Sequence, residues 1–245
     1  MLATQQIGQD NGLITGVGSS AYETDSYTKL LIHSDTSDEA TSYSDSSGQN
    51  HTINRNGTVN HDTAQAKIGA TSIRFGGTSS DWLNSGNHAD WSFGTGDFTI
   101  DFWVRWASGD IDSNDVIMQY YHTGSIFQDH MTLSVAANTM NFGMASNNNV
   151  RCDYTWTIPN SGWIVNKWYH VAIVRNGANL YGFFDGTAVS TTPGTAIDAN
   201  TSFPDQGSDL TIGKGHYANR MFKGWLDEIR ISKGIARWTS NFGVA

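Results

Sequence analysis

The sequence predicts an all-β protein built as a two-sheet antiparallel β-sandwich, and three observations support this fold class. Apolar and polar residues alternate with period two in at least six segments, as they do in strands with one buried face. Of the 23 acidic residues only Glu23, Glu39 and Glu228 are glutamate, so the chain is poor in a residue that builds exposed helix faces. The 26 glycines, with many Asn, Asp and Ser residues, suit the turns between short strands.

The chain divides into two parts of unequal size. Residues 1–26 are polar and Gly-rich without periodicity, and we expect them to form an extended arm that orders only against a partner. Residues 27–245 are expected to form one sandwich of about twelve strands. In chain order these strands cover residues 27–33, 51–54, 72–75, 97–106, 116–121, 130–135, 139–144, 167–175, 179–184, 187–190, 208–213 and 222–232.

The apolar segments that predict the first strands are short, and the alternation that predicts the central strands is clearer. Residues 27–33 are followed by a polar stretch that ends in the turn sequence Asp45-Ser-Ser-Gly48, and Gly76-Gly77 ends the strand at 72–75. The clearest strand is residues 97–106, with one apolar face and one more polar face, so we expect it to be half-buried. Its core face is formed by Phe98, Ile100, Phe102, Val104 and Trp106.

The later strands pair through short turns. Residues 130–135 and 139–144 are separated by a gap of hairpin length. The strands at 167–175 and 179–184 are joined by Asn176-Gly177, and an Asn-Gly step adopts positive φ at little cost, so this is the strongest hairpin signal in the chain. Asp185-Gly186 then turns the chain toward residues 187–190.

Charge and composition exclude several classes of partner. The net charge of −9 disfavours nucleic acid and anionic membrane surfaces, both of which attract basic proteins. No apolar run approaches the length of a membrane span, so we expect no membrane insertion. Cys152 is the single cysteine and forms no intramolecular disulfide. The first twelve residues lack the pattern of a secretion signal, so we expect folding in a reducing cytosol.

The residues also argue against catalysis. A retaining glycosidase needs two carboxyl groups about 5 Å apart. The three glutamates lie far apart in the sequence, and there is no Gly-x-Ser-x-Gly elbow and no phosphate-binding Gly-rich loop. We therefore expect no enzyme, with a glycoside hydrolase as the catalytic alternative.

Seven motifs, in order and spacing, carry a resemblance that covers about residues 27–242. They lie at residues 29–35, 45–48, 66–69, 72–77, 93–105, 167–175 and 224–238. This set resembles the concanavalin A-like, LamG-like jelly rolls of the lectin/glucanase fold, in particular the form common in phage and metagenomic proteins. The resemblance implies a jelly roll and a non-catalytic module that binds glycans or proteins, many of which hold a structural calcium. The Glu-x-Asp-x-x-Glu motif of related glycosidases is absent here.

Asp227 is the main candidate for a metal ligand. It shares strand parity with Ile229 and Ile231, so its carboxylate points toward an apolar face and needs a partner. A calcium ion would supply one, and the resemblance suggests Asp35 as a second ligand. The alternative is an Asp227 capped by backbone amides or paired with an arginine such as Arg74. The eight histidines are scattered without zinc-ligand spacing.

Aromatic residues near loops and strand ends are the candidates for sugar contacts. The rings of Trp and Tyr offer an apolar face with a polar edge, on which a sugar stacks. The candidates are Trp82, Trp91, Tyr121, Trp156, Trp163 and Tyr217. For each one the alternative is a residue that anchors a loop.

Two functions from different classes fit these observations. The first is a bacteriophage virion protein, such as a capsid decoration, tail or fibre component, that is assembled in the host cytoplasm and presents a lectin-like sandwich to surface glycans. It would dock to other virion proteins through residues 1–26 as a homo-oligomer or symmetric assembly. The second is an extracellular carbohydrate-binding module of a larger secreted protein.

Overall fold

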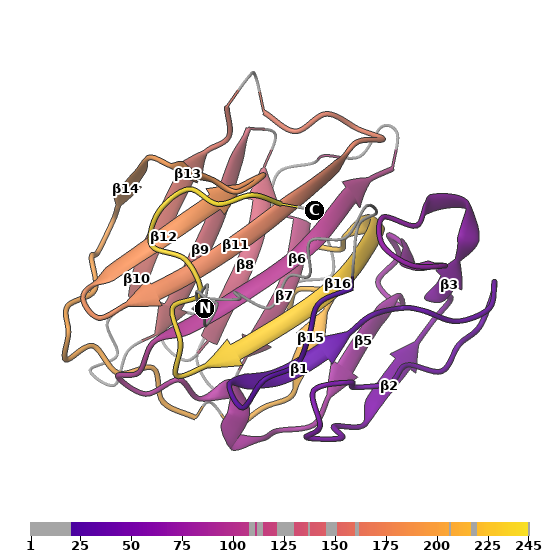
Figure 1. Cartoon of the computed structure of the whole chain (residues 1–245), viewed down its shortest axis with the longest axis horizontal. Coiled ribbons are helices and arrows are strands. Elements are labelled where there is room, and N and C mark those ends of the chain that lie inside the picture. Colours follow the sequence, from indigo (N-terminus) through magenta and orange to yellow (C-terminus); the bar gives the residue numbers. More distant parts are fainter. Residues whose placement is uncertain are drawn as a thin grey trace, which may run out of the picture.

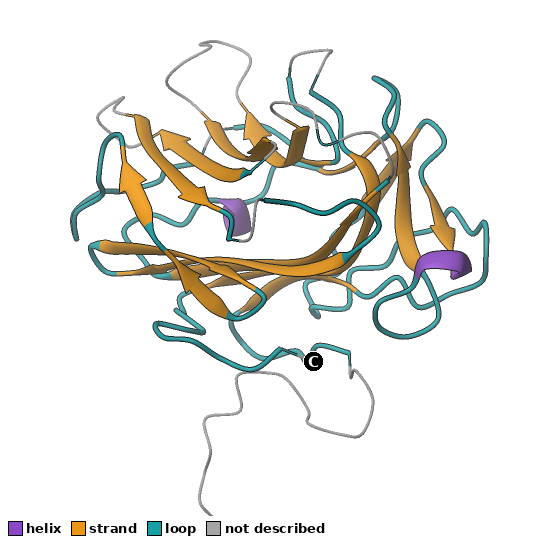
Figure 2. Ribbon diagram, turned by 90° about the horizontal axis from the view of Figure 1, so that it is seen from above, coloured by secondary structure: helices purple, strands orange, loops and turns teal. Residues whose placement is uncertain are grey.

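The computed structural model describes residues 21–107, 111, 115–121, 130–136, 138–145, 151–159, 162–205, 207–216 and 220–244. Two antiparallel sheets face each other across one core (Figure 2), which confirms the predicted β-sandwich. In the described part of the chain the helices are two 3-10 turns, η1 (Thr63–Gln65) and η2 (Ala89–Trp91). No helix among these residues has the length and apolar character that crossing a membrane requires.

The front sheet lies toward the viewer in Figure 1. Its strands in spatial order are β13 (Thr187–Val189), β12 (Asn179–Phe184), β11 (Trp168–Asn176), β6 (Phe98–Trp106), β16 (Lys223–Lys233), β4 (Ser72–Gly76) and β3 (Asn60–Asp62), and β1 (Thr28–Ile32) also pairs with β16. The β11–β12 hairpin forms as predicted, with Asn176 opposite Asn179 and Gly177 at a φ of 58°.

The back sheet lies behind the front sheet and contains the other eight strands of the described chain. In spatial order they are β14 (Thr191–Pro193), β10 (Arg151–Thr157), β9 (Thr139–Ala145), β8 (His130–Ala136), β7 (Asp115–Tyr121), β15 (Leu210–Ile212), β5 (Trp82–Ser85) and β2 (Ile53–Asn56). The inner faces of the two sheets enclose the main apolar core, which contains the predicted core face of β6.

The outer face of the front sheet is also buried, because both ends of the described chain cross it. We call residues 21–27 the N-terminal strap and residues 234–244 the C-terminal strap. Tyr22 of the N-terminal strap packs with Leu31 and Trp103, and Trp238 of the C-terminal strap stacks on Phe242 with ring centroids 3.9 Å apart. Strand β6 is therefore buried on both faces, which corrects the expectation of a half-buried strand.

The N-terminal strap also changes the predicted boundary of the arm. Tyr22 is buried, and its backbone N–H donates to Glu228 Oε2 at 2.6 Å. Tyr22 thus packs on the sandwich, and the exposed Asp25 accepts from Arg237 at 3.0 Å. The rest of the predicted arm, residues 1–20, lies outside the described part of the chain.

Strand β16 changes partners at a bulge. It pairs with β4 over residues 223–226 and with β1 over residues 229–232, and the register shifts between Asp227 and Arg230. Glu228 at the bulge has a φ of 50°, a conformation that a non-glycine residue rarely adopts. The bulge places Asp227 and Glu228 side by side in the interior, where both are fully buried.

Candidate ligand-binding site

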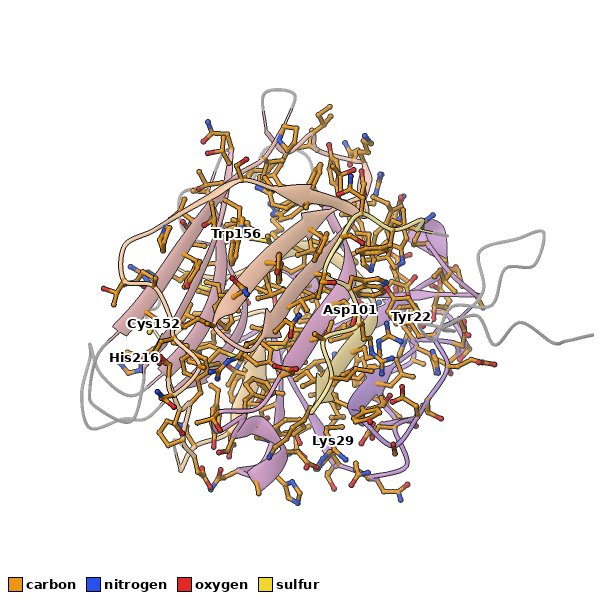
Figure 3. All side chains as sticks on the ribbon, turned by 60° about the vertical axis from the view of Figure 1, so that its left-hand side comes forward. Tyr22, Lys29, Asp101, Cys152, Trp156 and His216 are labelled. Atoms are coloured by element: carbon orange, nitrogen blue, oxygen red, sulfur yellow. The ribbon has the colours of Figure 1, made fainter. Side chains whose placement is uncertain are left out.

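A surface cavity of about 430 Å³ lies over β7, β15 and β5 of the back sheet, a size common for small-molecule sites. The strands contribute Trp82, Gln119 and Thr211, and the segments on either side of β15 contribute Asp209, Lys214 and His216. We call it the Trp82 cavity. It lies on the side opposite the straps, since Figure 3 shows His216 and Tyr22 on opposite sides of the molecule.

Strand alternation places these side chains on the outer face. Thr211 in the middle strand lies opposite Gln119 of β7 and Asn84 of β5. Leu83, which follows Trp82 in β5, is fully buried in the main core, so Trp82 points outward and is half-buried. Strand β5 is only four residues long, too short to show a clear alternation in the sequence, so it was not predicted as a strand.

Hydrogen bonds hold the polar lining in place. The Nε2 of Gln119 donates to Thr132 Oγ1 at 3.1 Å, and its Oε1 accepts the backbone N–H of His216 at 2.6 Å. Asp209 Oδ2 accepts from Asn84 Nδ2 at 2.9 Å. The polar groups are therefore preorganised around the cavity rather than free to rotate.

The Trp82 ring and a cation form the chemical centre of the cavity. The ammonium of Lys214 lies 5.0 Å from the centroid of the Trp82 ring, within the range of a cation–π contact. An aromatic ring with hydroxyl, carboxylate and ammonium groups beside it suits a ligand with one apolar face and a polar edge, such as a sugar ring.

Three of the other predicted contact residues are not at the surface. Trp91, Trp156 and Trp163 are 2%, 0% and 6% exposed, so the expectation that these rings line a sugar site is corrected. Trp91 and Trp163 anchor loops, because their Nε1 atoms donate to the carbonyls of Gly86 and Thr139. Trp156 belongs to β10 and packs in the core beside β12.

The side chains of the two candidate tyrosines, Tyr121 and Tyr217, lie outside the described part of the structure. Tyr121 is the last residue of β7, whereas the whole of Tyr217 lies outside that part. Their role as ligand contacts stays a prediction.

Asp227 is capped by backbone amides, which is the alternative that the sequence left open. Its Oδ2 accepts the N–H groups of Lys67 and Ile68, both at 3.0 Å, and its Oδ1 accepts the N–H of Glu228 at 3.0 Å. Burial raises the pKa of Asp227 to about 8, against the opposing pull of these amides. Three N–H dipoles pointing at the carboxylate repel a cation, so the surroundings of Asp227 do not fit a calcium ion.

Asp35 lies beside the same loop but makes a separate contact. It is exposed, and its Oδ1 accepts the N–H of Ala70 at 2.8 Å. The two predicted metal ligands therefore accept from different amides of the 67–70 loop. Calcium remains a prediction of the resemblance alone.

A buried ionic network lies beneath the N-terminal strap, and the sequence did not predict it. Arg230 donates to both oxygens of Asp101 at 3.0 and 2.9 Å, and the two residues are 1% and 0% exposed. The Arg230 guanidinium holds the pKa of Asp101 at about 2, although burial opposes this. In their strands, Asp101 and Arg230 both occupy positions that point to the outer face of the front sheet. The sequence shows these positions, but it indicates an ion pair only when β6 and β16 are known to be neighbours.

Two histidines extend this network. The hydroxyl of Tyr22 and Nε2 of His170 are 2.7 Å apart, and the guanidinium of Arg230 lies 4.2 Å from the centroid of the Tyr22 ring. His33 Nδ1 contacts Glu228 Oε1 at 2.9 Å, and this hydrogen bond raises the pKa of His33. Glu228 is thus enclosed by the strap, where a polysaccharide does not reach it.

Comparisons with known proteins agree with the fold. Residues 75–237 match a Laminin G family model described as the concanavalin A-like lectin/glucanases superfamily. No curated protein matches the sequence.

Several solved structures of similar fold are binding domains of toxins. The binding domain of Paraclostridial Mosquitocidal Protein 1 is 14% identical with a TM-score of 0.63, over 86% of this chain and 50% of that one. The Botulinum Neurotoxin serotype G binding domain is 14% identical with a TM-score of 0.64, over 85% and 48%. The binding domain of Botulinum Neurotoxin DC in complex with SialylT is 17% identical with a TM-score of 0.59, over 86% and 49%. This chain spans about half of each, and at such identities the likeness shows the fold alone.

Proposed function

The chain belongs to the concanavalin A-like lectin/glucanases superfamily, and from this premise we propose that it is a non-catalytic module that binds a glycan in the Trp82 cavity. The observation that carries the proposal is the half-buried Trp82 ring with Lys214 beside it, in a cavity of ligand size. The flexible Lys214 side chain lies over the Trp82 ring, so it must move aside for a sugar ring to stack there, and the sugar hydroxyls then reach the polar lining.

The surroundings of the glutamates support a non-catalytic role. Glu23 and Glu39 are exposed on separate segments, and Glu228 is buried beneath the N-terminal strap. None of the three lines the Trp82 cavity. One of the similar toxin domains was solved in complex with SialylT, which supports a glycan as the class of ligand.

The test is a glycan array followed by titration of the best ligand. Trp82→Ala should weaken binding at least tenfold, or about 1.4 kcal/mol, because the stacking surface is lost. The matched control is Trp225→Ala, since Trp225 is also half-buried and lies near a cation, Arg105, at 5.5 Å, but on the front sheet. The control should bind like the wild type.

Three results would contradict the proposal. An array without ligands would favour a purely structural role. A ligand that binds equally well to Trp82→Ala would place the site elsewhere on the domain. Steady turnover of a polysaccharide by the pure protein would overturn the non-catalytic role.

We further propose that the chain is a bacteriophage virion component, with a module of a larger secreted protein as the alternative. The resemblance to phage and metagenomic forms supports this role, as does the polar composition of residues 1–20. Deleting residues 2–20 keeps the N-terminal strap, so the domain should still fold but should no longer join purified particles. If the truncated chain assembles normally, the sandwich itself makes the contact.

A further inference from the structure

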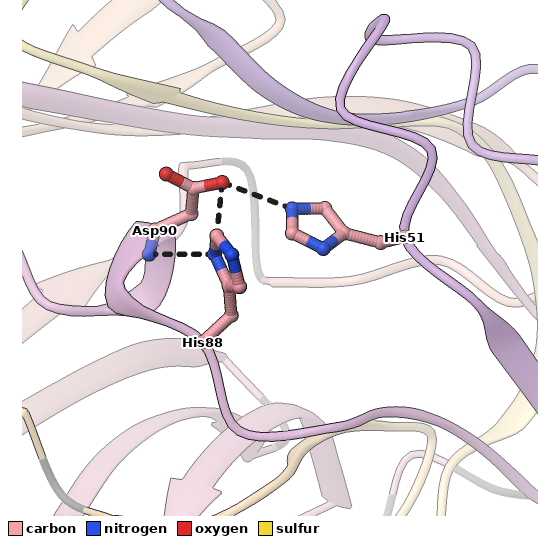
Figure 4. Close-up of side chains that lie close together, drawn as sticks. All are labelled: His51, His88 and Asp90. Atoms are coloured by element: carbon pink, nitrogen blue, oxygen red, sulfur yellow. Dashed lines mark hydrogen bonds and ion pairs between the residues drawn. The ribbon is translucent and has the colours of Figure 1, made fainter.

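At one end of the back sheet, His51 lies beside His88 and Asp90, which are far from it in the sequence (Figure 4). His51 precedes β2, and His88 follows β5. These strands are antiparallel with Ile53 opposite Ser85, so the residues before β2 and after β5 lie at the same end of the ladder. Asp90 in η2 completes the cluster, which sequence spacing could not show.

One nitrogen of each imidazole faces the same carboxylate oxygen, Asp90 Oδ2. Asp90 Oδ2 lies 3.0 Å from His51 Nε2 and 3.1 Å from His88 Nδ1, and the ligand atoms of all three lie within 4.8 Å of one another. Tetrahedral ligands at about 2.0–2.1 Å from a zinc ion are roughly 3.3–3.4 Å apart. A small outward movement of the carboxylate from the imidazoles would therefore create a metal-sized opening.

His88 Nδ1 can accept the backbone N–H of Asp90, at 3.2 Å, only when it carries no proton. In that state Nδ1 and Asp90 Oδ2, 3.1 Å apart, are two acceptors that face each other with no hydrogen between them. A metal ion would bind both atoms and would replace the amide hydrogen as the partner of the Nδ1 lone pair.

We propose that His51, His88 and Asp90 form a site for a divalent transition metal of the zinc class. Two imidazole nitrogens and one carboxylate oxygen are ligands that Zn²⁺ accepts, and three protein ligands leave a fourth position for water or a ligand. The His88 side chain is 50% exposed, so the site is open to solvent on that side, whereas those of His51 and Asp90 are 8% and 14% exposed. This site is distinct from the Trp82 cavity and does not depend on the proposed function.

The surroundings hold the ligands in place before any metal arrives. The His51 ring lies 4.7 Å from the ring of Trp91, which is buried and bonded to the carbonyl of Gly86. The backbone N–H of His51 donates to Asp45 Oδ2 at 3.0 Å. Such support lowers the entropy lost on metal binding. A bound ion would tie the segment before β2 to the segment after β5.

The test is titration of the full-length, tag-free protein with Zn²⁺, followed by calorimetry, after dialysis against a chelator. We expect one ion per chain and a higher melting temperature in its presence. Asp90→Asn and His88→Gln should each weaken Zn²⁺ binding about tenfold or more. Co²⁺ should give the visible absorption of a tetrahedral nitrogen and oxygen site, and His88→Gln should abolish it.

The matched control is His33→Gln. His33 also contacts a carboxylate, Glu228 at 2.9 Å, but the described structure brings no second histidine to that pair as a ligand. The control should bind Zn²⁺ like the wild type. No Zn²⁺ binding by the wild type, or equal binding by His88→Gln and the wild type with both folded, would overturn the proposal and leave a hydrogen-bonded cluster.

Discussion

The substitution Asp101→Asn tests how much the buried ion pair between Asp101 and Arg230 stabilises the front sheet. It keeps the shape of the side chain and removes its charge, so the Arg230 guanidinium, which is 1% exposed, is left without a counter-charge. Breaking a buried pair by removing one partner is strongly destabilising, because the other charge stays out of water. The double substitution with Arg230→Met removes both charges and should cost less than the sum of the two single changes.

The pKa of Asp101 gives the size of the expected loss in the free energy of unfolding. Lowering it from an ordinary 3.8 to about 2 corresponds to roughly 2.5 kcal/mol in the free energy of unfolding. Because the pKa is lower in the folded state, this contribution is present above pH 3.8. It is lost as the pH falls from about 3.8 to about 2. We expect Asp101→Asn to cost about 3 kcal/mol at pH 6 and progressively less below pH 4.

Urea unfolding, followed by tryptophan fluorescence at several pH values, measures the cost of the substitution at pH 6 and its decrease at lower pH. The slope of the free energy with urea should be the same for wild type and variant, so that the midpoint reports stability. A cost below about 0.5 kcal/mol at pH 6, or a cost that does not change between pH 6 and pH 3, would refute the reasoning.

Four other outcomes follow from described contacts. Asp227→Ala should cost about 1–3 kcal/mol, since it leaves three amide N–H groups without an acceptor, and urea unfolding measures the loss. Added calcium should leave the melting temperature unchanged if the amide caps exclude calcium from Asp227; a rise with added calcium that Asp227→Ala abolishes would contradict this. Gly182→Ala should cost about 1–3 kcal/mol, because its Cβ would lie 2.6 Å from the buried Trp156 ring, whereas Gly86→Ala meets no atom within 4 Å and should cost little. Glu228 raises the pKa of His33, so their contact should stabilise the fold below pH 6.5 and weaken as the pH rises through the higher folded-state pKa; the pH dependence should be smaller in His33→Gln.

Local pattern was sufficient to predict the sandwich and most of its strands. Period-two alternation marks the long strands, and Asn176-Gly177 marks the hairpin. Strand β10 was missed although Cys152, Tyr154 and Trp156 alternate there and are buried. The three other missed strands, β3, β5 and β14, are three or four residues long, too short to show a period.

Burial on the outer face of the front sheet could not be predicted in the same way. Thr99, Asp101 and Trp103 have the polar or mixed character of an exposed strand face, but they are buried because the straps cover them. The covering segments come from both ends of the sequence and have no period. Only the folded chain shows that a tyrosine at position 22 shields a charge pair formed by residues 101 and 230.

The candidate sites were predicted in part. Trp82 was named for the correct chemical reason, but Trp91, Trp156 and Trp163 were named for their place near loops, and their rings point into the core. Asp227 was correctly expected in a buried place, while the identity of its partners depends on a loop 160 residues away. The His51, His88 and Asp90 cluster depends on strand register, which a single sequence does not reveal.

The position of the straps sets the direction in which the domain faces. Both straps cross the outer face of the front sheet, so the described chain starts and stops on that side (Figure 2). The Trp82 cavity opens on the other sheet. A partner that holds the protein through the straps would therefore lie on that side, and the cavity would point away from it. Copies held side by side in this way would display their cavities as one array that faces outward.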